Sequence, residues 1–467
     1  MQMTQYETLK TQLAQNSPEE LAALIAELSA TEDAVYQAAI VFVQRKEPKK
    51  LLQTLRSQLR SLRTGKTFYT YRNARVFHNK LAAFLDSIER NLRPKAPLLA
   101  LDLLGQFFEA DAALFERADD SDGMIGDAFR RAAELFADIA DSQEFPPEAE
   151  AWFHRLLQKN DYGVRDRLLD NASRILAPLT LEKFIQTKRT MLEERPPASG
   201  NNPRDYSRHE LRVQIMQLAK ASNNIELFAE IALEGRPCKE SPAYSIEIAK
   251  HYLENGKAEK ALEYLPDFDA PAWNASADRL RLQALESLGR KDEANAKRLE
   301  NVSAYPSASA VSDYLKNVAA TDLESTKARL RTIILESSSS PMTRADGLTA
   351  LGNTADAADT IWQNAAAIQQ GSYYAQSDLA KKLDPQEPLA ATLLYRGAAE
   401  QTLDEAKPKN YRYAVNYLKK LQALEVLIKD WKGQEAHAAW WTRIHAKHDR
   451  KTSLTRELKK AGIGTTP

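Results

Sequence analysis

Residues 249–261 read AKHYLENGKAEKA, and residues 282–294 read LQALESLGRKDEA. In both stretches an apolar helical segment runs into a glycine, Gly256 or Gly289, and an alanine follows five residues later, Ala261 or Ala294. The two glycines are 33 residues apart, close to the ~34 residues of a tetratricopeptide repeat, which is a pair of antiparallel helices. Glycine would end the first helix, and a small alanine would let the second pack closely. The spacing therefore predicts TPR-like helical hairpins.

The same helical character extends outward along the whole chain. Leu51, Leu52, Leu55, Leu59 and Leu62 recur at helical spacing, and no convincing alternation of period two is present. Glycine accounts for only 16 of 467 residues, which disfavours a turn-rich β protein. We therefore predict an all-α chain, an α-α superhelix of antiparallel helix pairs with TPR-like hairpins in its middle and C-terminal parts.

Two polar stretches predict boundaries between parts of the chain. Residues 196–203 read PPASGNNP, in which the prolines prevent helix continuation, and residues 337–341 read SSSSP. We predict a helical domain over 1–195 with a basic segment (45–80) and an acidic one (109–150), TPR-like repeats over 207–336, and C-terminal repeats with a basic end over 342–467.

Composition excludes several classes of protein. Lys and Arg together number 64, as do Asp and Glu, so the chain is neither globally basic nor acidic. The single cysteine, Cys238, excludes an intramolecular disulfide framework and a multi-cysteine metal site. No signal peptide and no membrane-spanning apolar run is visible, which predicts a cytoplasmic protein that does not enter a membrane. We find no catalytic motif, so we predict no enzymatic activity, cofactor or metal centre.

Charge is strongly segregated although the total is zero. Residues 45–80 carry eleven bases and one acid, residues 109–150 thirteen acids and three bases, and residues 407–467 fourteen bases and five acids. Aromatic residues interleave with the first basic segment, a pattern that can hold phosphates and stack bases. One alternative is that the 45–80 and 109–150 segments neutralise each other; others are a nucleic acid or an acidic protein partner. The candidate polyanion contacts are Arg56, Arg60, Arg63, Lys66, Tyr69, Tyr71, Arg72 and Arg75.

Two acidic motifs form the best candidate site. The first acidic motif, residues 119–127, reads DDSDGMIGD, and the second, residues 160–166, reads NDYGVRD. Neither completes a calcium-binding EF-hand loop. We expect the interval between them to hold two helices that bring the loops together, although helix capping explains each loop separately. If they meet, the candidate acidic cluster comprises Asp119, Asp120, Asp122, Asp127, Asp161 and Asp166, and it would suit a cation or a basic peptide.

These two motifs, with the run from YRYA (411–414) to HDRK (448–451), resemble an uncharacterised family of bacterial all-helical proteins, a domain of unknown function. The resemblance covers most of the chain and implies a helical fold and a bacterial cytoplasmic setting. It brings no known activity. Some related proteins carry a SWIM-type zinc finger, which needs several cysteines and therefore cannot form around Cys238 alone.

The hairpin repeat and the absence of catalytic motifs favour a non-enzymatic scaffold or adaptor that mediates protein–protein interaction. We expect a partner groove in the region 252–314, with Tyr252, Trp273 and Tyr305 as contacts. The alternative is a nucleic-acid-associated protein that uses the basic, aromatic-containing segment 45–80.

Overall fold

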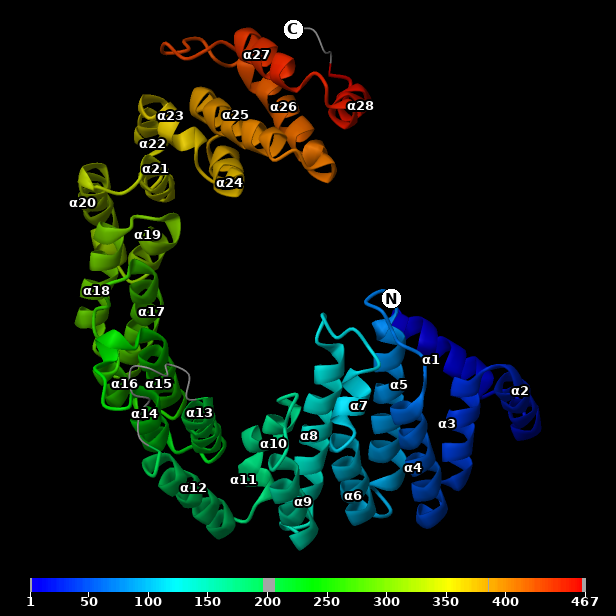
Figure 1. The fold of residues 1–467 in the computed structure, drawn as a ribbon. Helices are drawn as coiled ribbons and strands as arrows, with labels where there is room; N and C mark the ends of the chain where they lie inside the picture. The colour runs from blue at the N-terminus through cyan, green and yellow to red at the C-terminus, as the bar shows by residue number, and fades with distance from the viewer. Residues whose placement is uncertain (1, 196–205, 385, 464–467) are drawn as a thin grey trace. The chain divides into compact units, whose positions relative to one another are not determined.

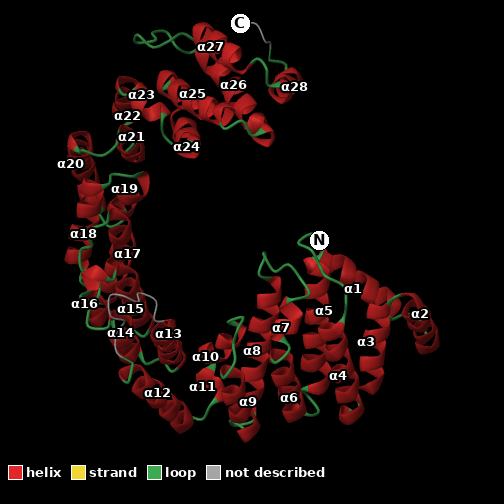
Figure 2. Cartoon of the chain, in the orientation of Figure 1, coloured by secondary structure: helices red, strands yellow, loops and turns green. Residues whose placement is uncertain are grey.

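The computed structural model describes residues 2–195, 206–384 and 386–463, which form 28 α-helices and five short 3₁₀ or π-helical turns (Figures 1 and 2). These residues contain no β-strand; an isolated parallel β-bridge joins Tyr69 and Ala118. The predicted all-α class is confirmed, and the superhelical path stays a prediction. No helix within the described ranges is long and apolar enough to cross a membrane.

The backbone forms two compact units, Met1–His251 and Tyr252–Pro467, and the division falls inside α15. The α-helices of the first unit, up to and including α15, are α1 (Gln2–Leu13), α2 (Pro18–Thr31), α3 (Asp33–Gln44), α4 (Pro48–Thr64), α5 (Ala74–Ser87), α6 (Pro97–Phe108), α7 (Asp111–Phe115), α8 (Met124–Ser142), α9 (Pro147–Leu157), α10 (Arg167–Asp170), α11 (Ala172–Ile175), α12 (Pro178–Glu193), α13 (Tyr206–Ala221), α14 (Ile225–Leu233) and α15 (Pro242–Glu254). Its short turns are η1 (Ile88–Leu92), η2 (Val164–Asp166) and η3 (Cys238–Glu240).

The second unit continues the succession of helices. Its α-helices are α16 (Ala258–Glu263), α17 (Pro271–Ser287), α18 (Lys291–Ala304), α19 (Ala308–Leu315), α20 (Leu323–Glu336), α21 (Pro341–Ala350), α22 (Thr354–Gln363), α23 (Ala365–Gln369), α24 (Tyr373–Leu383), α25 (Pro388–Asp404), α26 (Tyr411–Glu425), α27 (His437–His448) and α28 (Thr452–Ala461). Its short turns are η4 (Ala320–Asp322) and η5 (Pro408–Asn410).

Within each unit, helices that follow one another pack side by side. In the first unit α2 packs on α3, α3 on α4, and α4 on both α5 and α6 (Figure 1). In the second unit the most extensive packing joins α24, α25 and α26. Most residues of α25 are buried on every face, so α25 is the central helix of the C-terminal core.

The glycines of the sequence repeat end helices as predicted. Gly256 and Gly289 have φ of +71° and +70°, left-handed values that favour glycine. The residue after each donates its backbone N–H to a carbonyl five residues earlier, Lys257 to Tyr252 and Arg290 to Leu285, which is the Schellman helix end. Ala261 is fully buried in α16, the helix that follows Gly256. Assignment to the tetratricopeptide class stays a prediction.

The predicted boundary at 196–203 lies outside the described residues. The 337–341 stretch is a connection between α20 and α21, where Ser340 caps α21 by accepting the N–H of Thr343 at 3.1 Å. The division into 1–195, 207–336 and 342–467 therefore stays a prediction.

Candidate functional site

Three arginines of α4 lie on an exposed face beside its buried leucines. Arg56, Arg60 and Arg63 are spaced by four and three residues, which places them on one exposed face. Lys66 and Arg72 follow in the connection to α5, and Arg75 lies in the first turn of α5; all three are exposed. We call this surface the basic face; it comprises Arg56, Arg60, Arg63, Lys66, Arg72 and Arg75.

Most of the basic face has no internal counter-ion. Arg56 pairs with Asp102, its Nη2 2.8 Å from Oδ2. Within the described part of the chain, the other five bases form no ion pair. The basic face is therefore a cluster of solvated positive charges and not a network of internal ion pairs.

Arg117 fixes the connection between α4 and α5. Its Nη1 donates to the Leu62 carbonyl at 2.5 Å, at the C-terminal end of α4, and its Nη2 donates to the Thr67 carbonyl at 3.3 Å. A Cβ on Gly65 would lie 2.5 Å from the guanidinium nitrogens, so the absence of a side chain there permits this close approach. The positions of Lys66 and the residues after it therefore depend on Arg117.

The two aromatic candidates differ in exposure. Tyr69 is 7% exposed and stacks on Phe77, with ring centroids 4.9 Å apart. The prediction that Tyr69 stacks with a ligand base is therefore wrong: the β-bridge to Ala118 turns its ring into the core. Tyr71 is 58% exposed, and a hydrogen bond to the Asp122 carboxylate raises the pKa of its hydroxyl.

The basic segment 45–80 and the acidic segment 109–150 meet, but they do not neutralise each other through ion pairs. Besides the bonds of Arg117 to the Leu62 and Thr67 carbonyls, their contacts include the backbone bonds of Tyr69 with Arg117 and Asp119, at 2.8 and 2.9 Å, and the bond of Tyr71 to Asp122. Among the described residues no base of 45–80 forms an ion pair with an acid of 109–150. The acids use other partners instead, as in the Asp127–Arg130 pair at 2.5 Å.

The first acidic motif caps α8. Asp120 accepts the N–H of Ile125 at 2.6 Å and that of Gly126 at 3.3 Å, which satisfies free donors at the start of the helix. Asp119 accepts the N–H and the hydroxyl of Ser121, and these bonds lower the pKa of its carboxyl. The capping alternative explains this loop.

The second acidic motif forms a tight turn. Asn160 Oδ1 accepts the N–H of Arg165 at 3.1 Å, and Gly163 has a φ of +70°. Asp161 is exposed and lies 3.5 Å from Lys159 Nζ. Asp166 is half-buried, and desolvation raises the pKa of its carboxyl, with Glu210 adding to the shift.

Aromatic packing places the second motif beside the N-terminal half of α8. The ring of Phe115 stacks on Tyr162 at 5.0 Å and on Phe129 at 5.8 Å between centroids. The carboxylates of the candidate cluster nevertheless keep separate partners. No group of three or more His, Cys, Asp or Glu side chains within the described ranges is arranged to hold a metal ion. The expectation that the six aspartates suit a cation is therefore not supported.

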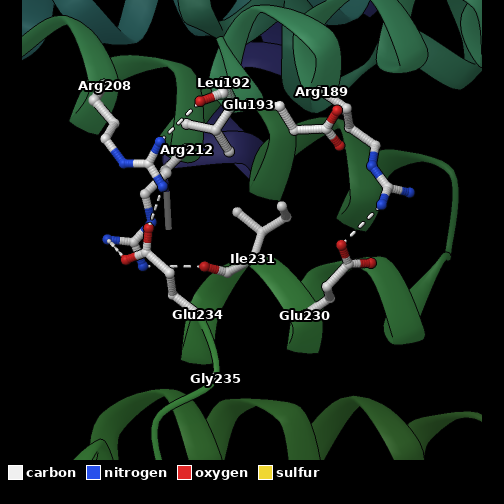
Figure 3. Close-up of a pocket in the computed structure, with 9 residues that line it drawn as sticks. All are labelled: Arg189, Leu192, Glu193, Arg208, Arg212, Glu230, Ile231, Glu234 and Gly235. Atoms are coloured by element: carbon white, nitrogen blue, oxygen red, sulfur yellow. Dashed lines mark hydrogen bonds and ion pairs between the residues drawn. The ribbon is translucent and has the colours of Figure 1, made fainter. Parts of the chain in front are cut away.

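A pocket of about 230 Å³ lies between α12, α13 and α14 (Figure 3). Glu234 binds Arg208 at 2.6 Å and Arg212 at 3.2 Å, and these arginines lower the pKa of its carboxyl against the opposing effect of desolvation. Arg208 also donates to the Leu192 carbonyl, and Arg212 to that of Ile231. These arginines thus bind the last turns of α12 and α14, which indicates a structural role. The lining residues are Arg189, Leu192, Glu193, Arg208, Arg212, Glu230, Ile231, Glu234 and Gly235.

Sequence comparison identifies the family. The chain matches the family of unknown function DUF6880 over residues 5–456. It belongs to this family. The resemblance to an uncharacterised helical family is thereby confirmed, whereas the link to SWIM-type zinc fingers stays an expectation. No curated protein matches this DUF6880 chain.

One solved structure aligns with this DUF6880 protein, a "Circular tandem repeat protein with novel repeat topology and enhanced subunit contact surfaces". The identity is 14%, and the alignment covers 95% of this chain and 89% of that one. The TM-score is 0.14, so the likeness carries no argument about function.

The predicted groove contacts divide between core and surface. Tyr252 is buried, whereas Trp273 and Tyr305 are exposed. Two arrangements that sequence reasoning missed involve buried arginines, Arg165 in the first unit and Arg396 in the second. A charged residue within an apolar helical stretch, as at Arg396 in LLYRGAA (393–399), is the signal that could have found the second.

Proposed function

We propose that this protein is a non-enzymatic helical-repeat scaffold that binds a partner protein, and that the basic face receives an acidic segment of that partner. The proposal includes the cytoplasmic location predicted from the sequence. The observation that carries it is the set of exposed bases on α4 and α5 that lack an internal counter-ion within the described residues. A partner carboxylate can pair with these side chains without breaking an ion pair of the scaffold.

Electrostatic complementarity of this kind chiefly sets the association rate and the choice of partner. Binding that relies on exposed arginines is screened by salt. Stacked helices also present long surfaces that suit extended partners. Together these properties support recognition of an acidic segment, with Arg60 and Arg63 at the centre of the surface.

Affinity purification from the native host tests the proposal. The wild-type chain is compared with Arg60→Glu/Arg63→Glu and with a matched control, Arg456→Glu/Lys459→Glu, whose exposed bases have the same spacing of three residues on α28. We expect a stoichiometric protein that the wild type and the control retain and the first variant loses. If both variants retain the partner equally, the basic face is not its binding surface. If no stoichiometric partner is recovered, the proposal of a scaffold is wrong.

A second candidate function is nucleic-acid binding, favoured by the exposed arginines together with exposed Tyr71. Counter-ion release would give a slope of log K against log salt of about −0.9 per neutralised duplex phosphate. Fluorescence anisotropy with single- and double-stranded oligonucleotides at two salt concentrations measures it. The absence of binding at low salt eliminates this candidate. If the wild type binds an oligonucleotide and Arg60→Glu/Arg63→Glu does not, nucleic-acid binding is favoured over a protein partner.

A further inference from the structure

Arg396 lies in the middle of α25 and is only 1% exposed. Its guanidinium carbon is 5.0 Å from the ring centroid of Trp431 and 5.2 Å from that of Trp440. Nη1 donates to the main-chain carbonyl of Glu435 at 2.6 Å. Burial lowers the pKa of Arg396 to about 10, so the side chain remains positively charged at neutral pH.

One edge of this guanidinium is unpartnered. Both Nε and Nη2 of Arg396 are buried, and neither has a hydrogen-bond partner within the described residues. These two nitrogens carry the parallel N–H bonds that bind a carboxylate in two-point fashion. Buried donors without acceptors are unfavourable and call for an explanation.

A second buried arginine shows how the Nε and Nη2 donors of a guanidinium are paired elsewhere in this chain. Arg165 is also buried, and its Nε and Nη2 donate to the two oxygens of Asp111 at 2.7 and 2.9 Å. In two half-buried arginines, Arg212 and Arg344, a buried nitrogen also lacks a partner among the described residues, but only at Nε. Arg396 therefore differs in leaving a complete two-point edge unused.

The acids around Arg396 are engaged elsewhere. Glu400 accepts Trp440 Nε1 at 2.6 Å and Arg443 Nη2 at 3.3 Å. The Glu435 carboxylate accepts Arg443 Nη2 at 3.0 Å. Glu425 acts on Arg396 through its charge, but no hydrogen bond joins the two in the described structure. None of these carboxylates occupies the free edge.

A second unpartnered polar atom lies nearby. The ring of His437 stacks on Trp440, with centroids 5.7 Å apart, and its Nδ1 is buried without a hydrogen-bond partner in the described residues. The region thus combines a positive two-point donor, an additional imidazole nitrogen and flat aromatic surfaces. These features match a ligand with a carboxylate on a planar apolar body.

We propose that the Nε/Nη2 edge of Arg396 binds the carboxylate of a small aromatic ligand, whose ring lies against Trp431 and Trp440. The ligand enters beneath residues 426–436, the non-helical connection between α26 and α27 that supplies Trp431 and the Glu435 carbonyl. Side-chain bonds attach this connection to the helices, among them Gln434 Nε2 to the Trp362 carbonyl at 3.1 Å and Arg443 Nη2 to the Glu435 carboxylate at 3.0 Å. The site is independent of the basic face.

Benzoate is the probe, and neutral benzamide at the same concentration is the matched control, with sodium chloride holding the ionic strength constant. We expect benzoate to change tryptophan fluorescence saturably and to raise the melting temperature by about 2–4 °C. Benzamide lacks the charge and leaves both unchanged. A wild-type protein that responds equally to the two compounds, or to neither, overturns the proposal.

The Arg396→Lys variant tests the two-point geometry because it keeps the charge and removes the parallel donors. We expect at least a roughly 10-fold weaker apparent affinity for benzoate. Arg456→Lys, a substitution at an exposed arginine of α28, keeps the wild-type affinity. Unchanged affinity in Arg396→Lys contradicts the proposal. If that variant does not fold, the difference between benzoate and benzamide in the wild type still decides it.

Discussion

Arg165 and Asp111 form a buried two-bond ion pair between residues 54 positions apart, with side chains only 9% and 4% exposed. Arg165 belongs to the second acidic motif and Asp111 is the first residue of α7. Arg165 Nη1 also donates to the Leu156 carbonyl near the end of α9, at 3.3 Å. The second acidic motif therefore links η2 to α7 and α9.

Asp111→Asn is expected to lower the free energy of unfolding by about 3–5 kcal/mol, because it leaves a buried guanidinium uncompensated. Urea denaturation measures the loss. Asp127→Asn is the control, since it breaks the exposed pair with Arg130 and costs less than about 1 kcal/mol. Equal effects of the two substitutions would show that the Arg165 pair is no stronger than a surface pair.

Gly105→Ala is expected to destabilise the first unit by about 1–3 kcal/mol through overpacking. A Cβ at this position in α6 would collide with the indole of Trp152. Gly126→Ala in α8 is the matched substitution, because its Cβ would have only Asp120 Oδ2 within 4 Å, at 3.8 Å. Thermal denaturation should show a loss for the first and little change for the second; equal melting temperatures would contradict the packing argument.

Asp120→Ala is expected to cost about 0.5–2 kcal/mol, the usual effect of losing a helix cap. Asp120→Asn keeps one acceptor for the Ile125 N–H and should lose less. Melting temperatures measure both, and partner binding is expected to stay unchanged. If a folded Asp120→Asn protein loses partner binding, the first acidic motif takes part in that binding.

Stability is expected to fall as the pH drops below about 6.5, partly because of His437. Burial lowers the pKa of its ring, with Arg396 adding to the shift. The unfolded chain therefore binds the proton first, so the stabilisation is complete above pH 6.5 and is lost as the pH falls towards the folded-state value. Between pH 7.5 and 5.5 the contribution is at most about 1.4 kcal/mol.

Denaturation midpoints at these two pH values test the role of His437. His437→Gln should reduce the difference between them, whereas His445→Gln, a substitution on the same helix, serves as the control. An unchanged difference in His437→Gln would assign the pH dependence to other groups.

Local sequence pattern was sufficient for the helices and for several of their ends. The leucines of α4 predicted an amphipathic helix, and the glycines at 256 and 289 predicted helix ends, since both features depend on neighbouring residues alone. Periodicity did not reveal whether a face is covered. Leu24, Ile25 and Leu28 show the same spacing in α2 yet are exposed, because covering them requires a neighbour that local sequence does not specify.

The candidate site was less predictable because its geometry depends on contacts distant in sequence. Tyr69 is bonded to the strand-like segment at Ala118 and stacks on Phe77, and Asp111 meets Arg165 although α8 and α9 lie between them in the sequence. The bases of the basic face are apparent in the sequence as a cluster, and their exposure became evident only from the structure. The free edge of Arg396 had no counterpart in any local motif.

The hydrogen bonds of Arg117 and Tyr69 affect the order in which the helices unfold. They tie α4 to residues 117–119, beyond α5, α6 and α7, whereas a simple array is held by nearest-neighbour contacts and frays from its ends. Unfolding that begins at α1 reaches in α4 a helix that Arg117 also bonds to a segment beyond its sequence neighbours. Limited proteolysis should therefore trim the N-terminal helices to about residue 45 and then pause, because α4 to α8 open together as one cooperative block.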